Sequence, residues 1–347
     1  MEKHNKKRAS LRQYPVLLAF GLFFLGLFVL DLVTPDRAYS ELENTTLAQR
    51  PKLTAPTADG LNNYFTGYTK YVKDQVFGRD EWISLQGFVE TALFQKTENG
   101  GILLGKEHQM FPRTYSLLSS ETRALPKNTA ALESLCQRYP GKVNVMLVPA
   151  ASVIYPENVP AGAPLLHEEP YLDQLSSTVQ AAGGRFVDVR DPLRSHKDEY
   201  LYFRSDHHWT ALGAYYAYTA FCESARLKAE PLSKFESGEY TGFLGSLYSA
   251  IKAYPQSQAL ADNPDTVQFW RPFVDLDTKW YPDAEFSMEY FGGTLFKVDD
   301  TANKYLTFLG GDHPITVIKT NVDGPVCMIL KESYGNAFTP WLTSHYS

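Results

Sequence analysis

The apolar residues of the chain are most concentrated in a stretch close to its N-terminus. Residues 14 to 33 form a run of twenty whose only charged side chain is Asp31. A run of this length crosses the hydrocarbon core of a bilayer as a helix. We therefore predict a transmembrane anchor over residues 14 to 33. A cleaved signal peptide and a buried core helix are the alternatives, but the residues that follow the run contain only a weak cleavage signal.

The charges beside this run predict its orientation. Residues 1 to 13 carry five basic side chains and one acidic side chain, Glu2. Basic segments next to a membrane helix stay in the cytoplasm. The sequence therefore predicts a cytoplasmic basic tail over residues 1 to 13, in a single-pass protein of the cell membrane whose C-terminal body is extracytoplasmic.

Two segments beyond the apolar run are predicted to lead to the main body. Residues 34 to 60 are rich in Pro, Thr and charged residues without apolar periodicity, which indicates a stalk. Apolar residues then recur at helical spacing in two runs, 61 to 76 and 82 to 94, with a break at Phe77-Gly78. We interpret residues 61 to 98 as a helical lead-in.

The remaining chain alternates short apolar runs with helical patterns. Residues 99 to 111 are punctuated by Gly and indicate a short strand pair, and residues 121 to 139 indicate a helix. The runs at 143–148 and 185–189 are typical of buried strands, and a helical stretch at 170–182 separates them. This order is a βαβ unit, which predicts a parallel sheet covered by helices.

Three further segments complete this expected body, residues 99 to 347. Residues 210 to 225 predict a helix, residues 230 to 322 predict strands and loops, and residues 325 to 333 return to the buried-strand pattern. The predicted fold class is therefore α/β: a parallel sheet flanked by helices, with a β-rich insertion at about 230–322 and one N-terminal transmembrane helix.

Composition narrows the functions that this body can perform. The net charge is −6 and residues 1 to 13 contribute +4, so the remaining residues carry −10. An acidic body lacks the basic field that binds nucleic acid, and we exclude that class of partner. The cysteines Cys136, Cys222 and Cys327 lie far apart among apolar neighbours, which predicts buried free thiols and no zinc site.

The segment S-D-H-H-W-T, residues 205 to 210, carries the first candidate chemistry. It lies between the βαβ unit and a helix, where open α/β sheets place their binding loops. On an extended loop, Asp206 and His208 point to one side and His207 to the other, so the carboxylate is placed to orient the imidazole as a general base. The alternative is a helix that is capped by Ser205 or Asp206.

Ser333 is the second candidate. It lies where the last predicted strand ends and a helix-compatible run begins. Such a turn exposes a nucleophile at the carboxyl edge of a sheet and offers backbone N–H groups to an oxyanion. An N-cap serine is the alternative. Because both candidates fall at carboxyl edges of one predicted sheet, we predict a triad of Ser333, His208 and Asp206.

Metal chemistry is a competing interpretation of the adjacent histidines. Asp-His-His also occurs in dinuclear phosphoesterases of the DHH type, but those need further Asp and His ligands upstream, and adjacent histidines on an extended segment face opposite ways. Asp312 and His313 form a second candidate cluster, for which a turn before Pro314 is the simpler interpretation. We expect no metal and no cofactor.

The sequence resembles the DHHW-motif family of bacterial membrane-anchored proteins, which is named for Asp-His-His-Trp. That family is similar to the alginate O-acetyltransferase proteins with SGNH-hydrolase-like domains. The D-H-H-W-T and S-Y-G-N-A-F blocks together are the most specific part of the resemblance. It covers most of the chain through eight segments: S-E-L-E-N (40–44), Y-V-K-D-Q-V-F-G-R-D-E-W (71–82), N-G-G-I-L-L-G-K (99–106), L-V-P-A-A-S-V-I-Y-P-E (147–157), Y-F-R-S-D-H-H-W-T (202–210), F-L-G-S-L-Y-S (243–249), G-D-H-P (311–314) and K-E-S-Y-G-N-A-F (331–338).

The resemblance implies an SGNH-like catalytic domain with Ser333 as nucleophile, His208 as base and Asp206 as its orienting carboxylate. Residues beside these motifs are candidates for substrate binding: Trp209, Arg204, Tyr334 and Asn336. A packed indole is the alternative role for the tryptophan, because Trp is usually largely buried.

Two features depart from the family pattern. Glu332 stands where relatives usually have Asp, a change that is expected to leave the serine usable. The chain also ends at Ser347, fourteen residues after Ser333, where relatives continue into another strand. We therefore expect the chain to be truncated there.

These roles imply an O-acetyltransferase that moves an acetyl group onto a hydroxyl of a cell-surface or exported polysaccharide through an acetyl-serine intermediate. Acetyl-CoA is absent outside the membrane, so the resemblance implies a membrane-bound O-acyltransferase as donor partner. The acidic body argues against a strongly anionic glycan, and the aromatic residues of 230–322 serve either as core or as sugar-stacking platforms. A carbohydrate acetylesterase with the same triad and a non-catalytic glycan-binding or assembly protein are the alternatives.

Overall fold

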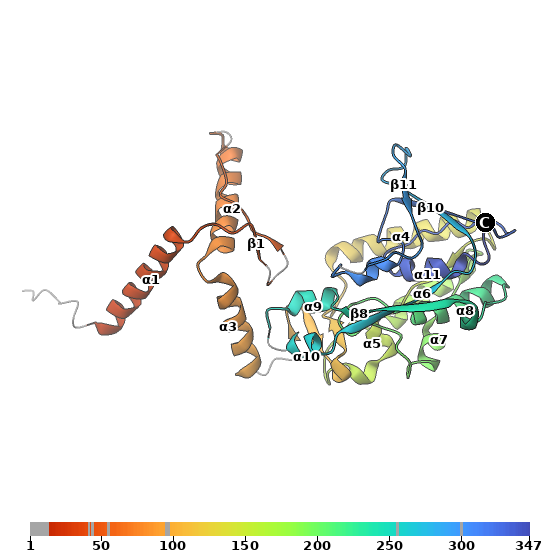
Figure 1. Cartoon of the computed structure of the whole chain (residues 1–347), viewed down its shortest axis with the longest axis horizontal. Coiled ribbons are helices and arrows are strands. Elements are labelled where there is room, and N and C mark those ends of the chain that lie inside the picture. Colours follow the sequence, from red (N-terminus) through yellow and green to blue (C-terminus); the bar gives the residue numbers. More distant parts are fainter. Residues whose placement is uncertain are drawn as a thin grey trace, which may run out of the picture. The chain divides into compact units, whose positions relative to one another are not determined.

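The computed structural model describes residues 14–40, 42, 45–53, 56–93, 98–254, 257–298 and 301–347. The chain forms two compact units, Met1–Phe94 and Gln95–Ser347 (Figure 1). The predicted basic tail, residues 1 to 13, lies outside the described residues, as do Glu41, Glu43 and Asn44 of the first motif segment.

The N-terminal unit begins with the predicted apolar helix. Helix α1 spans Pro15–Val33, and every residue in it is at least partly exposed. Its 19 residues extend about 28 Å at the rise of an α-helix, close to the thickness of a bilayer core. Among the helices that the structure describes, α1 alone is long and apolar enough to cross a membrane.

Two helices with a sharp break follow, as the apolar spacing predicts. Helix α2, Ala58–Gln75, starts at Thr57, whose side chain accepts a hydrogen bond from the Gly60 N–H. Helix α3, Arg79–Ala92, starts after Gly78, which has a φ of 67° and so occupies a region that favours glycine. The short strands of this unit pair antiparallel: β1, Tyr39–Ser40, and β2, Thr45–Thr46.

The C-terminal unit opens with a small antiparallel sheet and a long helix. The predicted Gly-rich strand pair is present as three strands, β3 (Glu98–Asn99), β4 (Ile102–Leu104) and β5 (Met110–Pro112). Helix α4, Ser119–Arg138, follows and matches the predicted helix.

The predicted βαβ unit is present in a short form. Strand β6, Asn144–Val145, pairs in parallel with β7, Arg185–Phe186. Helices α5, Ala151–Ile154, and α6, Glu169–Ala181, lie between them in the chain. The fold is therefore a mixture of helices and small sheets. Among the described residues, the parallel strand pairing is this two-residue ladder, and the other strand pairs are antiparallel.

The structure does not show the larger parallel sheet that the apolar runs predict. Residues 325 to 333 form no strand within the described part of the chain, and Val326, Met328 and Leu330 are 84%, 80% and 80% exposed. Leu147, in the run expected to be buried on both faces, is 40% exposed. An apolar run forms a buried strand only where other segments cover both of its faces. The described residues leave the side chains named above exposed.

The β-rich segment is largely as predicted, with short α-helices and 3-10 helices inside it. Strands β8 and β9 pair antiparallel, and β10 pairs antiparallel with both β11 and β12 (Figure 1). The elements of this part are β8 (Glu236–Phe243), α9 (Ser246–Ile251), α10 (Gln258–Ala261), β9 (Asp265–Arg271), β10 (Leu276–Tyr281), β11 (Tyr290–Gly292) and β12 (Ile315–Thr320).

The main hydrophobic core joins α7, Arg190–Ser195, α8, Ala211–Ala225, and α11, Tyr334–Leu342. Helix α11 packs directly against α8. This packing brings the two chain segments that carry the candidate residues, 205–210 and 331–338, to one side of the core.

The cysteines match the prediction in two positions of three. Cys136 and Cys222 are buried free thiols, whereas Cys327 is free but exposed. The expectation for Cys327 is wrong because it lies in the uncovered segment that precedes Ser333.

Candidate active site

Ser333 occupies the turn between the extended segment and helix α11. Its backbone is helical, with φ −63° and ψ −24°, and within the described residues its side chain makes no capping hydrogen bond to the helix. Instead, the Ser333 Oγ lies 2.7 Å from the Nε2 of His208. Ser333 therefore stands at the N-cap position of α11, as the alternative expected, but its side chain binds an imidazole and does not cap the helix.

Asp206 binds the opposite side of the same imidazole. Its Oδ1 lies 2.6 Å from the His208 Nδ1 and accepts the His208 N–H at 3.0 Å, and its Oδ2 accepts the Ser246 N–H at 2.8 Å. Burial alone raises the pKa of Asp206, but these hydrogen bonds outweigh it and hold the pKa well below 3.8. The carboxylate is ionised at neutral pH and can only accept, so the proton of the imidazole lies on Nδ1 and Nε2 is free to accept from Ser333.

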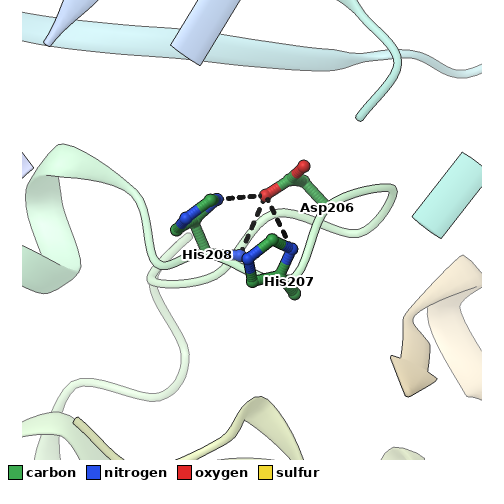
Figure 2. A group of neighbouring side chains, drawn as sticks. All are labelled: Asp206, His207 and His208. Carbon is green, nitrogen blue, oxygen red and sulfur yellow. Dashed lines mark hydrogen bonds and ion pairs between the residues drawn. The ribbon is translucent and has the colours of Figure 1, made fainter. Parts of the chain in front are cut away.

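The loop that carries this pair is bent, not extended as predicted. The His208 N–H turns back to Asp206, and the rings of His207 and His208 lie side by side with centroids 3.9 Å apart (Figure 2). The expectation that the two histidines face opposite ways is therefore wrong. The His207 Nδ1 lies 2.7 Å from the Ser246 Oγ, and burial together with the charge of His208 lowers the pKa of His207.

A second layer of buried groups fixes the loop. Asp265 is 1% exposed and accepts hydrogen bonds from the N–H and the Oγ of Ser205, at 2.8 and 2.5 Å. Gly245 lies so close to the loop that a Cβ there would sit 2.3 Å from the Cβ of Asp206. The helix after the loop starts at Thr210, whose side chain accepts from the Gly213 N–H, so neither Ser205 nor Asp206 caps it.

The four candidate substrate-binding residues fall into two groups. Arg204 pairs with Asp265 at 3.1 Å, the buried Trp209 donates its Nε1–H to the Tyr334 carbonyl at 2.9 Å, and the buried Asn336 donates to Asp312 at 3.1 Å. These three side chains are engaged in internal contacts. Tyr334 is half-buried, with its ring centroid 4.9 Å from that of His208 and its hydroxyl donating to the His207 carbonyl.

Sequence reasoning missed Tyr305. Its ring stacks on the His208 imidazole with centroids 4.0 Å apart and planes 12° apart, and its hydroxyl donates to the Ser333 carbonyl at 2.9 Å. Nothing in the local pattern around residues 304–307 marks a functional tyrosine among the many aromatic residues of this segment. The sequence around Asp265 is equally ordinary, whereas Gly245 and Ser246 lie inside the F-L-G-S-L-Y-S motif at residues 243–249.

The same loop also carries the residues of the alternative metal site. Asp206, His207 and His208 each offer a ligand atom, and these atoms lie within 4.8 Å of one another. However, both nitrogens of His208 face protein partners, Asp206 and Ser333, an arrangement that suits proton transfer. The second candidate cluster is divided: Asp312 pairs with Lys331 at 2.8 Å, and His313 stacks on Trp280.

A serine, a histidine and an aspartate hydrogen-bonded in this order form the arrangement of enzymes that transfer acyl groups through a serine. The family model described as "DHHW protein" matches residues 174–347, half of the chain. The chain therefore belongs to the DHHW protein family, as the resemblance implied.

Two curated relatives with low sequence identity are both named as O-acetylases. The chain is 26% identical over 180 residues to "Probable alginate O-acetylase AlgJ" of Pseudomonas syringae pv. tomato, which covers 48% of this chain and 46% of that protein. It is 24% identical over 256 residues to the protein of the same name from Pseudomonas putida, with 69% and 66% covered. The chain thus spans between about half and two thirds of the lengths of these relatives.

Solved structures support the fold. A DHHW family protein from Eubacterium siraeum DSM 15702 is 28% identical, with a TM-score of 0.56 over 72% of this chain and 81% of that one. Bacillus cereus PatB1 is similar in fold alone, with 14% identity and a TM-score of 0.54 over 71% of this chain and 83% of that one.

Proposed function

We propose that this protein is a membrane-anchored, extracytoplasmic O-acetyltransferase that acetylates a cell-surface or exported polysaccharide. The observation that carries the proposal is the hydrogen-bonded series from Ser333 Oγ through His208 to the buried Asp206. The relatives named probable alginate O-acetylase support acetyl transfer to a polysaccharide as the reaction class.

The first half of the proposed reaction acylates the serine. The Ser333 Oγ attacks the carbonyl carbon of an acetyl ester while His208 Nε2 takes the hydroxyl proton. The Asp206 carboxylate stabilises the imidazolium that forms. When the tetrahedral intermediate collapses, the bond to the leaving alcohol breaks, and that alcohol takes the proton from His208. Ser333 is left as an acetyl ester.

The second half transfers the acetyl group to the glycan. A sugar hydroxyl gives its proton to His208 Nε2 and attacks the acetyl-serine carbonyl, and Ser333 leaves with that proton restored. Water in place of the sugar would give an esterase, so exclusion of water decides between the two activities.

The oxyanion of each intermediate needs hydrogen-bond donors. The Tyr334 N–H at the start of α11 is a candidate, but in this structure it donates to the Glu332 Oε2 at 3.1 Å. The same Oε2 lies 3.5 Å from the Ser333 Oγ. Stabilisation of an oxyanion by the Tyr334 N–H therefore requires the exposed Glu332 side chain to move aside.

The proposed location follows from α1 and the basic residues before it. A helix of this length and apolarity supports a single-pass anchor, and the basic tail supports a cytoplasmic N-terminus. The acetyl donor would then have to be delivered outside the membrane, which supports a membrane-bound O-acyltransferase as partner. The polysaccharide acceptor would be reached from the outer side.

The test uses the full chain in detergent with an activated acetyl ester. Intact-mass measurement should show one added acetyl group that maps to Ser333, and Ser333→Ala and His208→Ala should abolish it. Ser177→Ala is a matched control, because Ser177 lies on an exposed helix surface and its hydroxyl donates to the Asp173 carbonyl of its own helix. The proposal would be contradicted if the folded protein gave no acetyl adduct and no ester turnover.

An experiment with an added sugar acceptor distinguishes a transferase from an esterase. Addition of neutral oligosaccharides to the acetylated protein should give acetylated sugar faster than free acetate if the protein is a transferase. Free acetate at an unchanged rate over a panel of glycans would favour the esterase. Glycan binding without any acyl-serine would favour the non-catalytic alternative.

A further inference from the structure

Tyr305 touches both the base and the nucleophile of the candidate site. It lies in a short 3-10 helix, Lys304–Thr307, and is 5% exposed. Its ring belongs to the main core, where it also meets Phe203 and Phe308 edge-on. A buried tyrosine hydroxyl needs a hydrogen-bond partner, and what is informative here is the choice of partners: the hydroxyl binds the Ser333 backbone and the ring lies on the His208 imidazole.

The first contact is with the imidazole of His208. The two rings are nearly parallel, with centroids 4.0 Å apart and an interplanar angle of 12°. The face of an aromatic ring carries negative potential and attracts a cation. In the proposed reaction His208 becomes a cation when it takes the serine proton, so this contact strengthens as the reaction proceeds. A contact that strengthens in the transition state accelerates the step.

The second contact is with the backbone of Ser333. The Tyr305 hydroxyl donates to the Ser333 carbonyl at 2.9 Å, and the Asn336 N–H donates to the same oxygen at 3.1 Å. The hydroxyl thus holds the turn from which the Ser333 Oγ projects. Burial and the nearby charge of Asp206 raise the pKa of Tyr305, so the phenol stays protonated and remains a donor.

The charged and titratable groups around this pair are few. Asp206, His207 and Tyr334 lie against His208, and Glu332 is next to Ser333. The Asp312 carboxylate, which pairs with Lys331, also interacts electrostatically with His208. The pKa of His207 is lowered, so the imidazole next to His208 is neutral near pH 7. Tyr305 is therefore the aromatic face against which the positive charge of His208 develops, while the opposing charge is supplied by Asp206.

We propose that Tyr305 is a positioning residue for acyl transfer: its ring holds the His208 imidazole in the plane where Nε2 faces Ser333 and stabilises the imidazolium, and its hydroxyl fixes the serine turn. This role rests on the proposed function of the site. It separates into a ring contribution and a hydroxyl contribution, and the two can be removed one at a time.

The test measures the rate of acyl-serine formation from an activated ester with the full chain. Tyr305→Phe keeps the ring and loses the hydroxyl bond, and should slow acylation about 3- to 10-fold, the loss expected for one hydrogen bond. Tyr305→Leu also loses the stacked ring and should slow it about 100-fold. Tyr155→Phe is the matched control, since Tyr155 is also buried and donates to a backbone carbonyl, that of Glu199. It should change the rate less than about twofold.

The pH profile supplies a readout that simple packing would not move. If the ring stabilises the imidazolium, Tyr305→Leu should shift the acidic limb of the acylation profile to lower pH, because the charged base is then less favoured. Tyr305→Phe should leave that limb in place. Melting temperatures of the variants show whether a lost rate reflects lost folding.

The outcomes separate this role from the proposed function. If the folded wild-type chain forms no acyl-serine and turns over no ester, the proposed function fails and this role fails with it. If the wild type acylates and both Tyr305 variants match Tyr155→Phe in rate and pH profile, the positioning role alone is overturned. Should Tyr305→Leu fail to fold, an unchanged rate for Tyr305→Phe would overturn the hydroxyl contribution, and a Tyr305→Trp variant with its acidic limb displaced to lower pH would overturn the ring contribution.

Discussion

The two segments that supply the candidate triad are held in different ways. The loop at 205–210 is held by hydrogen bonds to two polar residues: the buried Asp265 binds Ser205, and the exposed Ser246 binds Asp206 and His207. The segment at 325–330 that leads to Ser333 has exposed apolar side chains and no strand partner among the described residues. The base and its carboxylate thus lie on a loop held by hydrogen bonds, with the Tyr305 ring stacked on His208, whereas Ser333 is held by helix α11 and by the Tyr305 hydroxyl.

The largest expected effect comes from removing the group that fixes the loop. Asp265→Ala leaves the Ser205 N–H and the Arg204 guanidinium without their buried partner. Loss of one member of such a network costs about 3 kcal/mol of unfolding free energy. Urea unfolding of the full chain checks this value. The exposed Asp191→Ala is the control, and an equal effect of the two variants would contradict the account of the loop.

A smaller effect on folding, but a clear effect on acylation, is expected from Gly245→Ala. A Cβ at this position would lie 2.3 Å from the Cβ of Asp206, so the Asp206 side chain must shift, which disturbs its hydrogen bond to His208. We expect acylation to fall about 100-fold, because displacement of the orienting carboxylate by an ångström has costs of that size. Gly293→Ala is the control, since its nearest atom would be 3.5 Å away. Equal acylation rates of the two variants would show that the loop tolerates the shift.

The pH dependence of stability is expected to be moderate and to have a definite sign. Burial lowers the pKa of His207, His313 and His345 below 6.5 in the folded chain. The contribution of these histidines to the free energy of unfolding is complete above pH 6.5. It is lost as the pH falls, because the unfolded chain then binds protons that the folded chain does not. The melting temperature should therefore fall between pH 7.5 and 5.5. His313→Phe, which keeps a ring against Trp280, should reduce this slope, and a melting temperature that rises towards pH 5.5 would refute the assignment.

The smallest expected effect comes from chemical labelling of the exposed segment at residues 325–330. Cys327 is exposed, whereas Cys136 and Cys222 are buried. A maleimide should therefore modify one thiol per folded chain, at Cys327, and leave the fold unchanged. Partial burial of the sulfur raises the pKa of Cys327, so the reaction is best followed above neutral pH. A Cys327→Ser variant that still reacts at the same rate, or a wild type that does not react, would mean that this segment is covered in solution.

The sequence predicts well what depends on local pattern. The helices at 58–75, 79–92 and 211–225 follow from apolar spacing and from Thr57, Gly78 and Thr210 at their starts. Ser333, His208 and Asp206 stand out because each lies where an apolar run or helix meets a polar turn. Their contact across 125 residues is an interaction that periodicity alone can only suggest.

What the sequence predicts poorly depends on distant neighbours. The run at 325–330 is as apolar as a buried strand, yet its burial is decided by segments that cover it. The bend that places His207 beside His208 comes from backbone hydrogen bonds to Asp206 and from Ser246, 40 residues away from that carboxylate. Asp265 and Tyr305 act only through the fold, and their sequence surroundings are ordinary.

The central claim is that His208 and Asp206 make Ser333 a nucleophile, and one labelling experiment tests it without knowledge of the natural donor. The full chain is treated with an aryl sulfonyl fluoride, and the modified residue is mapped by peptide mass spectrometry over a range of pH. The account predicts sulfonylation at Ser333 that rises with the deprotonation of a single group, is absent in Ser333→Ala and is at least about 100-fold slower in His208→Ala. Labelling of other serines at the same rate, or of Ser333 equally fast without His208, would contradict it.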